Sequence, residues 1–83
     1  MALAFTRHAR DAMEKRGIAA DWVRRAAEQP QRTEPDSVDA ALEHRLAAIP
    51  EHGSRILRVV LDPAVSPVRV ITAYFDRKMK GQL

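Results

Sequence analysis

The sequence contains no cysteine and only three glycines among its 83 residues. The lack of cysteine excludes disulfide bonds, catalysis by a thiolate and cysteine-based metal sites, and it fits a reducing compartment, for which the cytoplasm is the default. Because the only glycines are Gly17, Gly53 and Gly81, the chain has no glycine-rich loop to hold a nucleotide phosphate. We therefore expect a cytoplasmic protein without a cofactor.

Long apolar runs are also missing. The N-terminal segment meets its first charge at Arg7, too early for the apolar region of a secretory signal or for a membrane span. The three histidines, His8, His44 and His52, lack the spacing of any familiar set of zinc ligands. We therefore expect neither membrane contact nor a metal site.

Arginine dominates the charged residues. The chain carries 14 basic and 11 acidic residues, for a net charge of +3, and 11 of the basic residues are arginine. Arginine offers a planar, bidentate donor suited to phosphate, whereas lysine acts as a point charge. A GC-rich genome would produce the same bias. Position favours an anionic partner, because several cations fall on the predicted strands or just after them: Arg55, Arg58, Arg69, Arg77, Lys78 and Lys80.

Two runs rich in β-branched residues form the centre of the predicted fold. Ile56 to Leu61 and Val68 to Phe75 flank a connector that holds Pro63 and Pro67, which is typical of two strands joined by a loop. We expect this pair to form the sheet core. Alternation along both runs mixes apolar and ionic side chains on each face, so it leaves open which face the rest of the chain covers.

Two helices are predicted in the first third of the chain. Thr6 is a suitable N-cap for the first helix, and Gly17 suits the left-handed residue just past its end. The second helix is expected from about residue 20 to residue 29, where Pro30 stops it. Trp22 lies on its apolar stripe, which favours a core anchor over an exposed base-stacking residue.

The segment from residue 36 to residue 49 has two interpretations. Its apolar residues recur at helical spacing, whereas its context, just before the turn predicted at His52 and Gly53, favours one arm of a hairpin. The preceding residues 31 to 35 are predicted to form a short edge strand, because Pro35 suits a central position poorly.

Four motifs taken together resemble a known group of proteins. They are F-T-R-H-A-R-D-A-M-E-K-R-G-I at residues 5–18, W-V-R-R-A-A-E-Q-P at 22–30, R-I-L-R-V-V at 55–60 and V-I-T-A-Y-F-D-R at 70–77. The set resembles a family of small bacterial domains of unknown function that is similar to BrnT and, more distantly, to RelE and ParE toxins. The resemblance implies a single α+β domain over residues 1–83. Two N-terminal helices would pack on a three- to four-stranded antiparallel sheet that includes residues 42–49.

The resemblance also implies an activity. BrnT- and RelE-like toxins cleave RNA without a metal and are neutralised by a cognate antitoxin protein. Such cleavage requires a base for the 2′-hydroxyl proton, cations around the phosphate and an acid for the leaving oxygen. The candidate catalytic residues are His8, His44, Arg58 and Tyr74, and the candidate RNA-binding residues are Arg45, Arg55, Arg77 and Lys78.

A second function stays open beside the ribonuclease. The chain is also compatible with a non-catalytic basic module that binds a protein partner or nucleic acid through its sheet face. A domain of this size has a thin core, which a homodimer or a bound partner would help. His8 alternatively bonds a backbone carbonyl, and Tyr74 alternatively packs on the sheet. Arg16 is expected to pair with a carboxylate such as Asp76 or Glu43 rather than to contact RNA.

Overall fold

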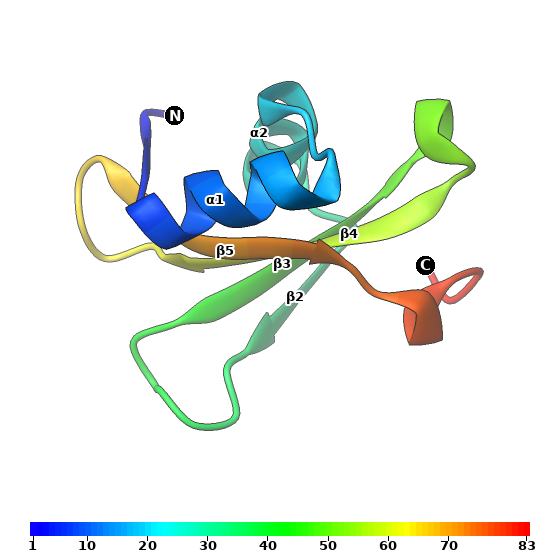
Figure 1. Ribbon diagram of the computed structural model, residues 1–83. Coiled ribbons are helices and arrows are strands. Elements are labelled where there is room, and N and C mark those ends of the chain that lie inside the picture. Colours follow the sequence, from blue (N-terminus) through cyan, green and yellow to red (C-terminus); the bar gives the residue numbers. More distant parts are fainter.

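The computed structural model describes residues 1–83 and contains two helices and a single five-stranded sheet. The elements are β1 Leu3–Phe5, α1 Arg7–Arg16, α2 Ala20–Glu28, β2 Arg32–Pro35, β3 Glu43–Ile49, β4 Arg55–Asp62 and β5 Val68–Phe75. Two short 3₁₀ turns, η1 Pro50–His52 and η2 Arg77–Met79, follow β3 and β5. Both helices lie on one face of the sheet, α1 over β5 and α2 over β3 and β4 (Figure 1). None of the helices is long and apolar enough to cross a membrane.

The sheet has the strand order β1-β5-β4-β3-β2, in which β1 runs parallel to β5 and all other neighbours are antiparallel. The α+β class with N-terminal helices is confirmed. The expected sheet of three to four antiparallel strands is wrong, because the short β1 adds a parallel edge strand. Val68 N donates to Ala2 O and Thr6 N donates to Val70 O. The three residues of β1 are too few to show an alternating pattern, and their partner strand β5 lies far along the chain, so the sequence did not predict this strand.

The ambiguous segment forms a strand, as its context indicated. In β3, Ala47 faces the helices opposite Leu57 of β4, while Leu46 lies on the other face opposite Arg58, and both Ala47 and Leu46 are buried. A strand buried on both faces loses the alternation that identifies strands, which explains the apparent helical spacing. Val38, which the helical interpretation placed on an apolar stripe, is 92% exposed in the β2–β3 loop.

The core lies between the helices and the sheet. Its fully buried members include Ala9 of α1, Val23 and Ala26 of α2, and Leu57 and Val59 of β4. The alanines let both helices approach the strands closely.

The ends of α1 match the prediction. The Thr6 hydroxyl accepts a hydrogen bond from Ala9 N at 3.0 Å and donates one to Ile71 O at 3.2 Å, so it caps the helix and ties it to β5. Gly17 ends the helix at a φ of 65°, a left-handed conformation that glycine adopts without steric cost. The same Thr6 therefore sets both the start of α1 and its position on the sheet.

Arg45 and Arg58 lie on opposite faces of the sheet, a difference that the sequence alone does not show. Arg45 of β3 is paired with Val59, which belongs to the core, so Arg45 lies on the helix-facing side. Arg58 of β4 is paired with Tyr74 of β5 on the opposite side, which we call the open face. Successive residues of a strand alternate between faces, and only the placement of the helices decides which face becomes the core.

Candidate functional site

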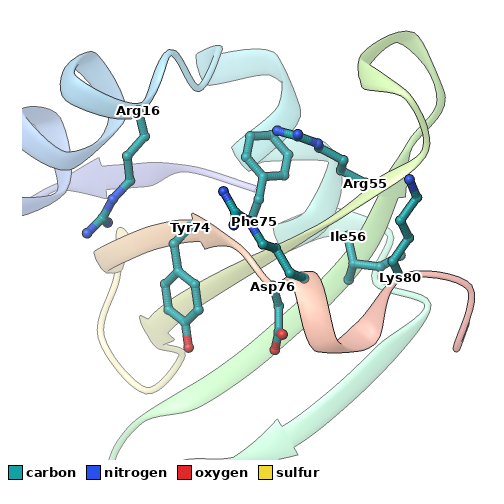
Figure 2. Close-up of a pocket in the computed structure, with 8 residues that line it drawn as sticks. Arg16, Arg55, Ile56, Tyr74, Phe75, Asp76 and Lys80 are labelled. Carbon is teal, nitrogen blue, oxygen red and sulfur yellow. The ribbon is translucent and has the colours of Figure 1, made fainter.

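A groove with a volume of about 510 Å³ lies beside the C-terminal end of β5. Its lining residues are Arg16, Arg55, Ile56, Tyr74, Phe75, Asp76, Arg77 and Lys80 (Figure 2). Half of them are cations and one is a carboxylate. We refer to this hollow as the cationic groove.

Three segments distant in sequence meet at the cationic groove: the end of α1, the start of β4, and the end of β5 with the η2 turn that follows it. Arg16 is the last residue of α1, Arg55 is the first of β4, and Arg77 opens η2, with Lys80 just past it. Because β4 and β5 are antiparallel, the start of β4 lies next to the end of β5, where Phe75 sits. In Figure 2, Arg55 lies beside the ring of Phe75, whereas Arg16 comes from α1 with its guanidinium turned away from that ring and Lys80 comes from the segment after η2.

The four cations of the groove form no ion pair. Asp76 is the only carboxylate in the lining, and it is already bound by Arg58 from the open face. Arg16 donates from Nη1 to the backbone oxygen of Ala73 at 2.9 Å, at the edge of β5 that β1 does not reach. The expected pairing of Arg16 with a carboxylate is wrong, because Asp76 pairs with Arg58. The positive charge in the groove is therefore not neutralised by the protein.

The wall of the groove is apolar and aromatic. Ile56 is buried, and the ring of Phe75 stacks on His52 with a centroid distance of 4.8 Å. His52 in turn lies 5.1 Å from the ring of Trp22, which packs against the core. This cluster holds Phe75 rigidly behind the cations.

Arg58 is the centre of a second charged cluster on the open face. Its Nε donates to Asp76 Oδ2 at 3.0 Å, and its Nη2 lies 2.9 Å from the same oxygen. Its Nη1 donates to Glu34 Oε1 at 2.9 Å. The same Nη1 lies 3.0 Å from Nδ1 of His44, whose Nε2 is 2.6 Å from Asp36 Oδ1. Since Nδ1 accepts from the guanidinium, Nε2 carries the proton that His44 donates to Asp36. We call these five residues the open-face network.

Two members of the open-face network, Arg58 and Asp36, have pKa values shifted towards their charged forms. Burial lowers the pKa of Arg58, but the hydrogen bonds to Glu34 and Asp76 outweigh that effect, so the pKa is raised. Hydrogen bonds from the backbone N–H of Asp39 and from His44 lower the pKa of Asp36 from its ordinary 3.8 to about 2. With three N–H groups engaged, Arg58 is committed to structure and not to an external anion.

The structure separates the residues that the sequence grouped as a site. His8 is exposed in the first turn of α1, on the opposite side of the sheet from His44 and Arg58. Arg45 donates from Nε to Glu43 and from Nη1 to the backbone oxygen of Ala27, both at 2.7 Å, beneath α2. These contacts hold Arg45 on the helix-facing side.

The remaining predicted residues do come together. Arg55, Tyr74 and Arg77 line the cationic groove, whereas Lys78 is exposed in η2 without lining it. Arg16 is a groove residue that sequence reasoning assigned to an ion pair. No local signal identifies its role, because its contact with Ala73 joins residues 57 positions apart.

Fold and groove together define a small α+β domain with an unneutralised cationic site at one end of its sheet. Residues 5–75 match the family described as Domain of unknown function (DUF4258), so the chain belongs to this uncharacterised family of small domains. The match includes both helices and strands β2 to β5, and it ends just before Asp76. A search of the curated proteins and a search of the solved structures found no match. Similarity to BrnT or RelE therefore stays a hypothesis from the sequence motifs.

Proposed function

We propose that the domain binds single-stranded RNA through the cationic groove. The observation that carries this proposal is the convergence of four cations, none paired with a carboxylate, on an aromatic wall. Unpaired cations beside aromatic rings are the combination that proteins use for single-stranded nucleic acid, where cations hold phosphates and exposed rings stack on bases. RNA as the target follows from the resemblance of the sequence to toxins that act on RNA.

Phosphate is the anion that this groove suits best. Three of its four cations are arginines, whose planar guanidinium groups can bind phosphate oxygens in bidentate fashion. Arg16 is already oriented by the backbone oxygen of Ala73, which leaves its other N–H groups available for a ligand. A preoriented donor loses less conformational entropy on binding. The Arg16 guanidinium is thus preorganised to bind an anion in the groove.

The aromatic wall favours a single strand over a duplex. Tyr74 and Phe75 line the groove from opposite sides of the end of β5, so a base can reach one ring or the other (Figure 2). A base can contact such rings only when it is not stacked inside a helix, which is why proteins commonly read RNA in single-stranded loops and ends. Groove binding therefore predicts weaker affinity for duplex RNA of the same length.

Fluorescence anisotropy with a labelled single-stranded RNA tests the proposal. With about three to four phosphates neutralised, log K should fall with log salt concentration with a slope of about −2 to −3. The double variant Arg77→Gln/Lys80→Gln should bind at least about tenfold more weakly, because it removes two groove cations. The control Lys15→Gln/Arg24→Gln removes two exposed helix cations outside the groove and should retain affinity. Equal losses in both variants would show that binding is not localised in the groove.

A ribonuclease toxin is the second candidate, and one observation favours it. Tyr74 lines the same groove as the cations, and its phenol is the side chain there that can act as a general acid. A cognate antitoxin protein and growth arrest on expression belong to this candidate. Under it, purified protein cuts RNA in the presence of EDTA, and Tyr74→Phe lowers the rate by about 10²-fold or more with binding retained. Binding without cutting leaves the non-catalytic module.

A further inference from the structure

Two of the four groove cations depend on a very short element. Arg77 opens η2, a single 3₁₀ turn, and Lys80 follows the turn as its C-cap residue. Within the turn, Met79 N donates to Asp76 O at 3.2 Å and Lys80 N donates to Arg77 O at 3.3 Å. Such long bonds in a single turn are weak, because 3₁₀ geometry is poor and the turn is short. The placement of these two cations must come from an anchor outside the turn.

Asp76 is that anchor. Its Oδ1 accepts from Lys78 N at 3.0 Å, which caps η2, and its backbone N donates to Ile56 O at 2.9 Å. Its Oδ2 accepts from Nε of Arg58 and lies 2.9 Å from Nη2 of the same guanidinium. The side chains of Asp76 and Arg58 are 16% and 11% exposed, so this pair is largely shielded from water. One carboxylate therefore joins the turn to the centre of the sheet.

Arg58 is itself fixed from the far side of the sheet. Glu34 on β2 and His44 on β3 both contact its Nη1, and Asp36 holds His44 from the β2–β3 loop. The open-face network thus runs from β2 through β3 and β4 to the end of β5. These contacts hold the Arg58 guanidinium in the orientation in which it faces Asp76.

We infer that Arg58 is a positioning residue for the cationic groove: it holds Asp76, and Asp76 holds the turn that presents Arg77 and Lys80. This inference rests on the proposed function, because it assigns a role in RNA binding to a residue that does not touch RNA. It replaces the direct contact between Arg58 and phosphate that the sequence suggested. The network is the framework of the groove and not part of its binding surface.

The first test uses the free protein and needs no RNA. Backbone ¹⁵N order parameters of residues 77–80 should fall from about 0.8 to below about 0.6 in Asp76→Asn and in Arg58→Gln. Asparagine retains an oxygen that can cap η2, so the first variant isolates the ion pair from the cap. The matched control is Glu43→Gln, which breaks the ion pair with Arg45 on the helix-facing side and should leave these values unchanged. Unchanged order in both network variants would overturn the inference.

The second test asks how Arg58 acts on RNA. In the otherwise wild-type chain, Asp76→Asn and Arg58→Gln should each lower RNA affinity about five- to tenfold and reduce the salt slope by about 1, because the turn cations are no longer held at the phosphates. In the Arg77→Gln/Lys80→Gln background, the same substitutions should cost less than about twofold, because the residues through which they act are gone. A loss of folded protein alone would lower the active fraction without changing the slope.

Two outcomes of this second test separate the hypotheses. An equal loss of affinity in both backgrounds would make Arg58 a direct ligand and would overturn the positioning role. If the wild-type protein binds no RNA, the proposed function fails, while the order parameters still decide whether Arg58 holds the turn. Should Arg58→Gln prove too unstable to purify, Asp76→Asn removes the same ion pair with a smaller change and answers the question alone.

Discussion

Arg55 and Arg58 lie three residues apart on β4 and have opposite environments. Arg55 is exposed at the start of the strand, has no ion-pair partner and lines the cationic groove. Arg58 lies in the middle of the strand, with a side chain 11% exposed and bound by two carboxylates. A shielded guanidinium is costly to leave unpaired, whereas an exposed one can exchange water for an anion. The position of an arginine along its strand therefore decides whether it can bind a ligand, and the number of arginines in the sequence does not.

The largest effect should come from breaking the network. Arg58→Met leaves Glu34 and Asp76 without their shared partner, and we expect a loss of about 2 to 4 kcal/mol in the free energy of unfolding. Arg55→Met should stay within about 0.5 kcal/mol, because it removes an exposed and unpaired side chain. Urea denaturation of the two variants measures both values. Similar unfolding midpoints for the two variants would contradict the different contributions to stability that we assign to Arg55 and Arg58.

Arg55 should matter for RNA affinity although it contributes little to stability. Arg55→Gln should weaken binding about fivefold and reduce the salt slope by about 0.7, because one phosphate contact is lost. Its unfolding midpoint should match that of the wild type. Titration of labelled RNA at several salt concentrations checks both the affinity and the slope. An unchanged slope would place Arg55 outside the contact with RNA.

The stability of the fold should depend on pH through two carboxylates, Asp36 of the open-face network and Glu51. The pKa of Asp36 is lowered to about 2, chiefly by the backbone N–H of Asp39 and by His44, and the hydrogen bond from Arg25 likewise lowers that of Glu51 to about 2. A carboxyl with a folded-state pKa below its unfolded value stabilises the fold above the unfolded pKa and loses that contribution as the pH falls through the folded one. Stability should therefore decline between about pH 4 and pH 2.

Asp36→Asn is the variant that tests this pH dependence. It should flatten the decline in the unfolding midpoint over that interval, because the residue that takes up a proton on unfolding is gone. Asp11→Asn, which removes an exposed carboxylate whose side chain forms no ion pair or hydrogen bond, serves as the control. A wild-type decline that persists unchanged in Asp36→Asn would contradict the assignment.

The smallest effect should come from Lys78. This residue is exposed in η2 between two groove residues, yet it does not line the groove. Lys78→Gln should change RNA affinity by about twofold or less, through the general field of the protein alone. Anisotropy at one salt concentration is sufficient. A loss as large as that of Arg55→Gln would extend the binding surface along the outer side of η2.

Local patterns predicted the elements that depend on neighbouring residues. Thr6 and Gly17 fix the ends of α1 by capping, and the β-branched runs identify β4 and β5. One feature escaped because it depends on a distant partner: the short β1 becomes a strand only beside β5. The strand β3 was predicted from its context and from the family resemblance, because burial on both faces hides its alternation.

The site was partly predictable for the same reason. Residue type and position on the predicted strands identified Arg55 and Tyr74, and position just after the last strand identified Arg77. The sequence did not separate Arg45 from Arg58, because their faces are decided by where the helices pack. Arg16 reaches the groove through a contact with a strand far along the chain, which no short-range pattern encodes.

The dependence of β1 and α1 on β5 has a consequence during synthesis. Both elements are translated first, yet both pack mainly on the strand that is translated last. The residues of β1 and α1 therefore remain without their native neighbours until Phe75 has left the ribosome, since long-range pairing cannot precede its partner. The groove contains both Arg16, which is translated early, and Tyr74, which is translated late. It can therefore form only after the whole fold has emerged from the ribosome.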